Sequence, residues 1–300
     1  MKNLKSKRSI GVTLSLSAGI LWGMMPLYIN LVDAADPYEI IAQRSLWSAV
    51  LLFVICWMRG HLGDIWMLIK GRRHLINFSI TTFFLLLNWS MYVYAVQTEQ
   101  VVAAALGYFI YPLCTVMLGI LVLNERLTAW AWIAIGFVGF GVLTKALMMT
   151  NVPWVSLALA GSFSLYAVLR KRMDFDPLQG LFIETLALFP FAIAFLIWMK
   201  ADGQVLFFGG GTANVCLALL AGVVTVLPLV LFLKGNSLLN MTSASLLFYS
   251  NPTAHLFLGV FVFSEPFVAF DLIPFGMIWA GIAVYFFTVG KAIDTTKSLA

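Results

Sequence analysis

The chain has 300 residues, of which 62% are hydrophobic and only 10% are charged, and its mean hydropathy is +0.96. A soluble domain carries about 25% charged residues, so this composition excludes a soluble globular protein and indicates that lipid surrounds most of the chain. The net charge of +5 reflects where Lys and Arg lie relative to the membrane and gives no reason to expect nucleic acid as a partner.

Long apolar segments follow one another along the whole chain. They are about 17 to 25 residues long and do not alternate with period two, which favours membrane-spanning helices over β-barrel strands. We therefore predict an all-α integral membrane protein with ten transmembrane helices and no separate soluble domain. The expected spans are 10–32, 38–58, 75–97, 101–123, 127–149, 154–169, 179–199, 214–233, 238–263 and 267–290.

The distribution of Lys and Arg predicts the orientation of these spans. If the N-terminus is cytoplasmic, every Lys and Arg except Arg44, Lys145 and Lys200 falls in a cytoplasmic segment, including the run at 170–172. Cytoplasmic loops are enriched in basic residues. We expect a multi-pass protein of the cell (inner, or plasma) membrane with both termini in the cytoplasm.

The second half of the chain repeats the first with an offset of 140 residues. The offset places Pro37 on Pro177 without a gap, and many positions after residue 106 also coincide. We predict two domains, 1–150 and 151–300, each with five spans. Because five is odd, the second copy enters the membrane from the opposite side, and inverted repeats of this kind are typical of secondary transporters that alternate access around a midplane site.

Each copy interrupts one apolar span with aromatic residues and a proline. The sequences are YFIYP at 108–112 and FYSNP at 248–252. Pro112 and Pro252 each remove one backbone hydrogen bond near the middle of a helix. They are either hinges for alternating access or simple kinks in packed helices. Farther along the same spans, Glu125 and Glu265 are expected to cap the start of the following helix.

Seven short segments occur in a distinctive order and spacing: LWGMMPLY (21–28), AQRSLWS (42–48), LNWSMYVYAV (87–96), LGYFIYP (106–112), VLNERL (122–127), FIETLALFP (182–190) and SEPF (264–267). Together they resemble the RarD-like branch of the EamA, or drug/metabolite transporter, superfamily. The resemblance covers nearly the whole chain. It implies a ten-span carrier with two EamA repeats that exports drugs or metabolites, similar to permeases associated by name with chloramphenicol sensitivity.

Polar and aromatic side chains within the spans suggest a substrate pocket, because such groups are costly in lipid. Asn88 and Tyr92, four residues apart, share one helix face. An aromatic, mildly polar pocket suits flat, amphipathic solutes, although each residue taken alone also fits an interfacial or core position. The expected substrate-binding residues are Trp22, Asn88, Trp89, Tyr92, Tyr108, Tyr111, Thr115, Tyr166, Tyr249, Asn251 and His255.

Two charges lie well inside spans at equivalent repeat positions, Arg44 in the second and Glu184 in the seventh. The inverted repeat places them toward opposite faces of the membrane. Glu184 is either a proton-coupling carboxylate or a structural charge that a neighbouring hydroxyl satisfies. Arg44 is expected to be a structural anchor.

Three functional classes fit an integral membrane protein of this kind. A secondary carrier of small amphipathic or aromatic solutes, such as metabolites, amino acids or drugs, fits the repeat, and protons are its candidate coupling ion. The alternatives are an integral-membrane enzyme and a passive channel. The sequence has no HExxH or GxSxG motif and no GK[ST] after its glycine run at 209–211, so we expect no catalytic residues, no metal and no cofactor. The chain is expected to act as a monomer or homodimer.

Overall fold

The computed structural model describes residues 2–32, 34–98, 100–147, 154–173, 175–203, 211–264 and 272–298. All regular structure in these ranges is α-helical, which confirms the all-α part of the predicted fold. The helices are α1 (Lys2–Gly23), α2 (Met25–Leu31), α3 (Pro37–Met58), α4 (Leu62–Lys70), α5 (Arg72–Gln97), α6 (Val101–Leu123), α7 (Ala129–Leu147), α8 (Trp154–Met173), α9 (Pro177–Ala201), α10 (Thr212–Leu238), α11 (Met241–Leu247), α12 (Ser250–Phe261) and α13 (Leu272–Ser298).

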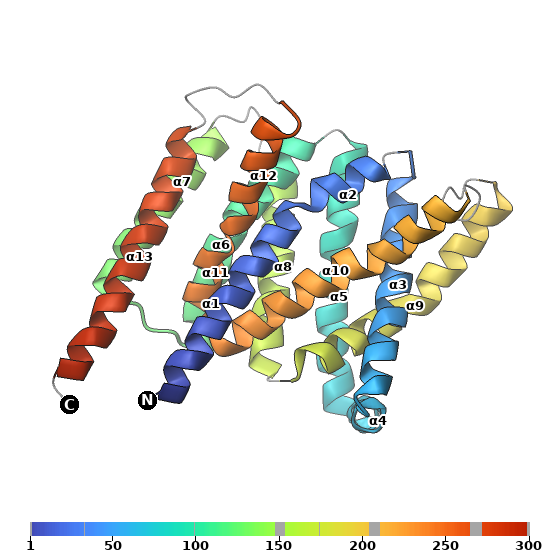
Figure 1. Cartoon of the computed structure of the whole chain (residues 1–300), viewed down its shortest axis with the longest axis horizontal. Coiled ribbons are helices and arrows are strands. Elements are labelled where there is room, and N and C mark those ends of the chain that lie inside the picture. Colours follow the sequence, from blue (N-terminus) through green and yellow to red (C-terminus); the bar gives the residue numbers. More distant parts are fainter. Residues whose placement is uncertain are drawn as a thin grey trace.

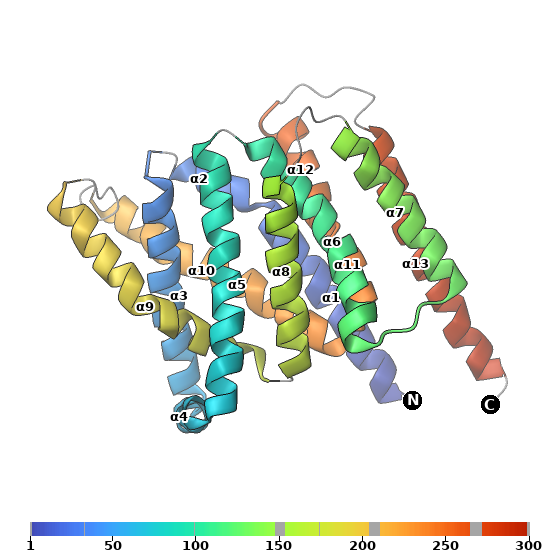
Figure 2. The ribbon, with the colours of Figure 1, turned by 180° about the vertical axis from the view of Figure 1, so that it is seen from behind.

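The helices stand side by side in one bundle, with α7 and α13 at one edge and α9 at the other (Figures 1 and 2). Helix α10 crosses the bundle obliquely. The two ends of the chain lie at the same end of the bundle (Figure 1), called the near end below. The opposite end, called the far end, carries α2 and the connection between α5 and α6.

Length and apolar composition mark several of these helices as membrane-spanning, and the expected number of ten stays a prediction. Among the described residues, fewer than ten helices are long and apolar enough to count as membrane spans, for two physical reasons. Helix α8 ends in Arg170, Lys171 and Arg172, which lower its hydropathy, and the ninth expected span is divided between α11 and α12. The segments long and apolar enough to cross a bilayer are Ser6–Leu31, Pro37–Met58, Arg72–Tyr92, Ala103–Leu123, Pro177–Ala201 and Thr212–Leu238, with shorter apolar helices at Ala129–Thr144 and Leu272–Thr288.

Some boundaries differ from those expected. The first span breaks at Met24 into α1 and α2, two residues before Pro26. The connection at 59–74, expected to be a loop, contains α4. Helix α8 extends beyond residue 169 to Met173. The basic run at 170–172 is therefore helical rather than part of a loop.

Helices α3 and α9 begin with the same Asp-Pro capping sequence at equivalent repeat positions. In each, an aspartate is the N-cap and proline follows at the first helical position, where its missing N–H costs nothing. The Tyr38 N–H donates to Asp36 Oδ1 at 2.7 Å, and the Leu178 N–H donates to Asp176 Oδ1 at 3.0 Å.

Helices α7 and α13 pack closely through two glycines that the 140-residue offset relates. A Cβ atom on Gly141 would lie 2.7 Å from the carbonyl oxygen of Pro274, and one on Gly281 would lie 2.6 Å from that of Ala134. The offset converts one contact into the other. Residue numbers rise along α7 while they fall along α13, so these two helices are antiparallel.

A hydrogen bond joins a second pair of offset-related residues. The Tyr249 hydroxyl donates to the carbonyl oxygen of Phe109 at 2.8 Å, and the two positions are 140 residues apart. Equivalent residues of two copies meet where a two-fold axis passes between them. The contacts between α7 and α13 and this hydrogen bond fit a pseudo-two-fold relation between two antiparallel copies, and the inverted repeat stays a prediction.

Candidate functional site

A cavity of about 480 Å³ lies in the half of the bundle toward the far end. Its walls come from α1 and α2, the first half of α3, the second half of α5, the first half of α6, and from α8, α10, α12 and α13. Both halves of the chain therefore contribute. A volume of this size is within the range of small-molecule sites, about 300–1,000 Å³.

The structure brings most of the expected pocket residues to this cavity. Its lining includes Trp22, Asn88, Trp89, Tyr92, Tyr108, Asn251 and His255, together with Pro252. Four other expected residues, Tyr111, Thr115, Tyr166 and Tyr249, do not line it and are buried among neighbouring helices.

Arg44 is the charged group among the described residues of the cavity wall, and its expected role as a structural anchor stays a prediction. Its Nε donates to Thr225 Oγ1 at 2.8 Å, and its guanidinium carbon lies 5.4 Å from the centre of the Trp89 ring. No Asp or Glu is among the described residues that line the cavity. The sequence located the charge within α3 but gave no signal for the direction in which the side chain points.

Asn88 connects α5 to α8 at the edge of the cavity. Its amide nitrogen donates to the carbonyl oxygen of Leu159 at 3.0 Å and to Ser162 Oγ at 3.1 Å. The rings of Tyr92 and Tyr108, on α5 and α6, lie 6.4 Å apart. The cavity wall is thus aromatic, with a few polar groups at fixed positions.

Aromatic rings close the cavity toward the near end. Trp22, Phe163 and Phe248 face the cavity, and their rings lie 5.5–5.8 Å apart where they meet Trp22. Behind them, the Tyr111 ring lies 4.9 Å from both Phe163 and Phe248. Phe232 packs on the same rings from α10. We call these five aromatic side chains, Trp22, Tyr111, Phe163, Phe232 and Phe248, the aromatic floor.

Three of the expected pocket residues outside the cavity make hydrogen bonds within the bundle, and their part in substrate binding stays a prediction. The Thr115 hydroxyl lies 2.8 Å from the carbonyl oxygen of Tyr111 and 2.9 Å from Ser164 Oγ, which joins α6 to α8. Tyr166 is fully buried and donates to Glu184. Tyr249 is fully buried and bonds to α6.

The two prolines act differently on their helices. Helix α6 runs without a break through Pro112, whereas the equivalent helix is divided into α11 and α12 just before Pro252. There the carbonyl oxygen of Phe248, which Pro252 leaves without its usual donor, accepts from the Asn251 N–H at 2.9 Å. The break borders the cavity, and Pro112 does not line it.

Glu184 belongs to a separate buried network toward the near end, away from Arg44. Glu184 is fully buried, and its Oε1 lies 3.4 Å from Nε of Arg170, which is itself buried. Thr81 donates to Oε1 at 2.6 Å and Tyr166 donates to Oε2 at 3.0 Å. Arg170, expected among the cytoplasmic loop charges, is therefore the partner of an intramembrane carboxylate.

A second polar cluster holds the two halves of the chain together at the near end. The carboxylate of Glu125 accepts from the N–H of Met241, and from the N–H and hydroxyl of Thr242 at 3.1 and 2.9 Å. Glu125 thus caps α11 and not, as expected, the following helix α7, whose first turn bonds to Thr128 instead. Glu265 lies outside the described residues.

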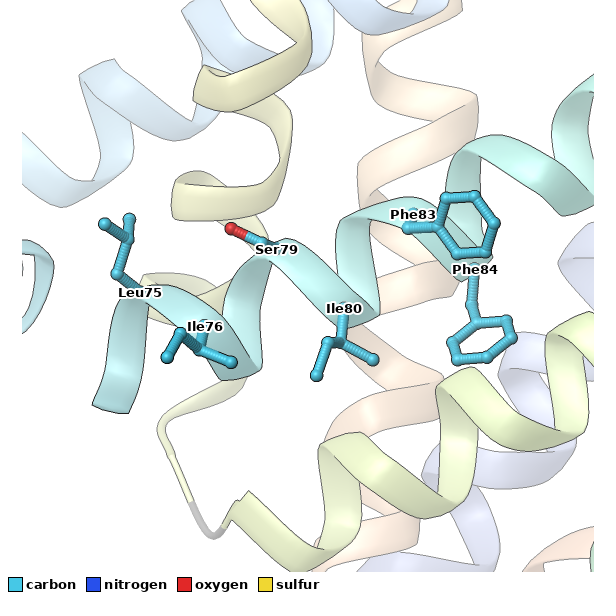
Figure 3. Close-up of a pocket in the computed structure, with 6 residues that line it drawn as sticks. All are labelled: Leu75, Ile76, Ser79, Ile80, Phe83 and Phe84. Carbon is cyan, nitrogen blue, oxygen red and sulfur yellow. The ribbon is translucent and has the colours of Figure 1, made fainter. Parts of the chain in front are cut away.

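A shallow hollow on the outside of α5 has a different character. Figure 3 shows its six lining residues along one helix: Leu75, Ile76, Ser79, Ile80, Phe83 and Phe84. Ile76 and Phe83 are about half exposed, and the Ser79 hydroxyl is the one polar side-chain group among the six. An exposed apolar helix face of this kind suits contact with lipid chains.

Comparison with known proteins identifies the family. The model of the EamA-like transporter family matches the chain twice, at residues 9–145 and 152–287. The chain belongs to the EamA-like transporter family. This confirms the resemblance found in the sequence, and it makes the protein a membrane transporter and not an enzyme.

Individual relatives of this EamA-like protein cover almost its entire length. It is 35% identical to an uncharacterized transporter of Vibrio cholerae over 92% of this chain and 91% of that protein. It is 32% identical to the protein RarD of Streptomyces exfoliatus over 93% of this chain and 89% of that protein. A solved crystal structure matches with a TM-score of 0.72 at 18% identity, over 92% of this chain and 97% of the other, which supports the fold alone.

Proposed function

We propose that this protein is a secondary transporter that exports small amphipathic or aromatic solutes by alternating access, with the far-end cavity as its substrate site. The observation that carries the proposal is the cavity itself: it lies in the far-end half of the bundle, is lined by both halves of the chain, and is bounded on its near-end side by the aromatic floor. A carrier in one of its two access states has this arrangement.

The proposed architecture is ten transmembrane helices in two inverted repeats, residues 1–150 and 151–300, with both termini cytoplasmic. The antiparallel packing of α7 on α13 through offset-related glycines supports the inversion. On this basis the far end faces the outside, and the cavity in that half of the bundle is an outward-facing substrate site. Uphill transport would draw on an ion gradient, with protons as the candidate ion, or on exchange.

The alternative of a passive channel is less well supported. A channel needs a continuous path, whereas the aromatic floor blocks the described bundle centre with rings 4.9–5.8 Å apart. Saturable, gradient-dependent uptake of labelled aromatic solutes into proteoliposomes separates the two functions.

A cavity variant connects flux to the site. Tyr108→Phe removes one hydroxyl from the cavity wall, and we expect it to raise the apparent KM several-fold with unchanged expression. Tyr94→Phe, on the partly exposed surface of the same bundle, is the matched control. Flux that is non-saturable, or equal in Tyr108→Phe and wild type, would refute the assignment of the cavity.

A further inference from the structure

We infer that the cavity binds the anionic group of its substrate, a carboxylate or similar oxyanion, through the guanidinium of Arg44, which makes amphipathic aromatic anions the substrate class. The inference rests on the proposed role of the cavity as the substrate site. It starts from an imbalance of charge: a permanent cation lines the cavity, and none of the described lining residues is acidic.

The nearest carboxylate along α3 does not correct this imbalance. Glu39 is fully buried and does not line the cavity. The phenol groups of Tyr92 and Tyr108 lie within electrostatic range of the guanidinium, but neutral phenols do not cancel its charge. Glu184, an intramembrane carboxylate on α9, is already paired with Arg170.

The surroundings of Arg44 hold its guanidinium in a fixed orientation. Thr225 accepts the Nε proton at 2.8 Å while its own hydroxyl lies 2.8 Å from the carbonyl oxygen of Ala221, so its lone pair is directed to Arg44. Trp89 supports the guanidinium by a cation–π contact at 5.4 Å. A side chain anchored in this way has lost much of the entropy that ligand binding would otherwise remove.

The anchored guanidinium keeps its binding edge available. Arginine has five N–H donors in a planar fork, and within the described residues only the Nε donor is engaged in a hydrogen bond. The two terminal nitrogens form the edge that binds a carboxylate through two parallel hydrogen bonds. In a wall that is mostly apolar, a bound anion would also neutralise a charge that is costly at membrane depth.

The volume and the lining of the cavity indicate which groups accompany the anionic group in the ligand. A cavity of about 150 Å³ accommodates benzene, so 480 Å³ holds an aromatic ring together with a short chain that ends in a carboxylate. Trp22 and Tyr92 supply aromatic rings to the cavity wall for contact with the aromatic part, while Arg44 lies on α3 in the same wall.

Three matched compounds test the inference on purified protein in phosphatidylcholine nanodiscs at pH 7.5: 3-phenylpropionate, its neutral amide, and phenethylammonium. Binding is measured by equilibrium dialysis and by the rise in thermal stability that a ligand of the folded state causes. We expect the carboxylate to bind roughly 10- to 100-fold more tightly than the amide, the range for hydrogen bonds to a charged group, and the ammonium to bind most weakly.

Variants assign the preference to one residue. Arg44→Gln should bind the carboxylate and the amide equally, and retained binding of the amide shows that it is folded. Arg44→Lys should keep part of the preference, because lysine retains the charge without the fork. Arg172→Gln, an exposed arginine at the end of α8, is the matched control and should behave as wild type.

The outcomes separate this inference from the proposed function. Equal binding of acid and amide by wild type, or a preference that persists in Arg44→Gln, overturns the anion site but leaves the cavity as a substrate site. Failure of all three compounds to bind wild type refutes the cavity proposal as well. In a parallel measurement, phosphatidylglycerol is added to the nanodiscs. Competition that depends on Arg44 would assign the site to a lipid headgroup and overturn the inference.

Discussion

The buried pair of Arg170 and Glu184 leads to a prediction about stability. Glu184→Gln keeps the shape of the side chain and the neighbourhood of Thr81 and Tyr166, but it removes the negative charge. Arg170, with only 5% of its surface exposed, then remains charged in the bundle interior because arginine does not release its proton. Removing one partner of a buried ion pair costs about 3–5 kcal/mol. We expect a loss near the lower end of that range, since the hydroxyl contacts can persist.

The reverse substitution should cost less. Arg170→Gln leaves a carboxyl group that can take up a proton and become neutral, while Thr81 and Tyr166 still bond to it. We expect a loss of about 1–2 kcal/mol, including the contact of the guanidinium with the Phe78 ring. The double variant carries no unpaired charge, so its loss should be smaller than the sum of the single losses by about 1–3 kcal/mol.

Unfolding of the purified variants in mixed micelles, followed by tryptophan fluorescence, supplies the four free energies of this cycle. A loss below about 1 kcal/mol for Glu184→Gln, or losses that add within about 0.5 kcal/mol, would refute the reasoning. The same Glu184→Gln protein tests proton coupling. A coupling residue would lose proton-driven transport and keep exchange, whereas transport with normal pH dependence would assign Glu184 a structural role.

Three further predictions follow from the packing and the proposed topology. Gly141→Ala should destabilise the protein by about 1–3 kcal/mol, because its new methyl group meets the backbone of α13. As the control, Gly139 faces open space, so Gly139→Ala should be neutral or stabilising by up to about 1 kcal/mol in the same unfolding assay. A cysteine at Ser264 should react with an impermeant maleimide from outside the cell, and a cysteine at Arg126 should react from the cytoplasmic side. Reaction of both cysteines from the same side would contradict the inverted repeat. Glu125→Gln weakens the bonds to α11 and should increase near-end labelling of a cysteine at Thr115 by roughly tenfold; unchanged labelling would show that the contact does not hold the near end closed.

The sequence predicted the features that depend on composition and periodicity. Apolar segment lengths predicted the helices, and the matching Asp-Pro pairs before α3 and α9 mark equivalent helix starts. Of the site, the residues on α5 and α6 that share one face, Asn88, Tyr92 and Tyr108, do come together at the cavity. Local spacing is sufficient there, because the helix fixes which side chains are neighbours.

Features that depend on how the helices rotate and tilt could not be predicted. The sequence groups Arg170 with its neighbours Lys171 and Arg172 as a loop charge, yet the rotation of α8 turns Arg170 inward to Glu184. Tyr111 is three residues from Tyr108, but it lies deeper, in the aromatic floor. The bond from Glu125 to α11 joins positions 117 residues apart, and no local pattern indicates it.

The inverted repeat also predicts which contact closes the far end in the second access state. In the structure, the Glu125 carboxylate binds the first amides of α11 at the closed near end. The 140-residue offset converts this contact into one between Glu265, which lies outside the described residues, and the first amides of α6, at Val101 and its neighbour. If the two halves exchange conformations during transport, the far end should close through this second contact as the first one opens. Spin labels at Ser264 and Gln100, which leave Glu265 and the first amides of α6 in place, should then approach one another when Glu125→Gln favours the near-end-open state. A distance that does not respond would show that the two ends close by unrelated contacts.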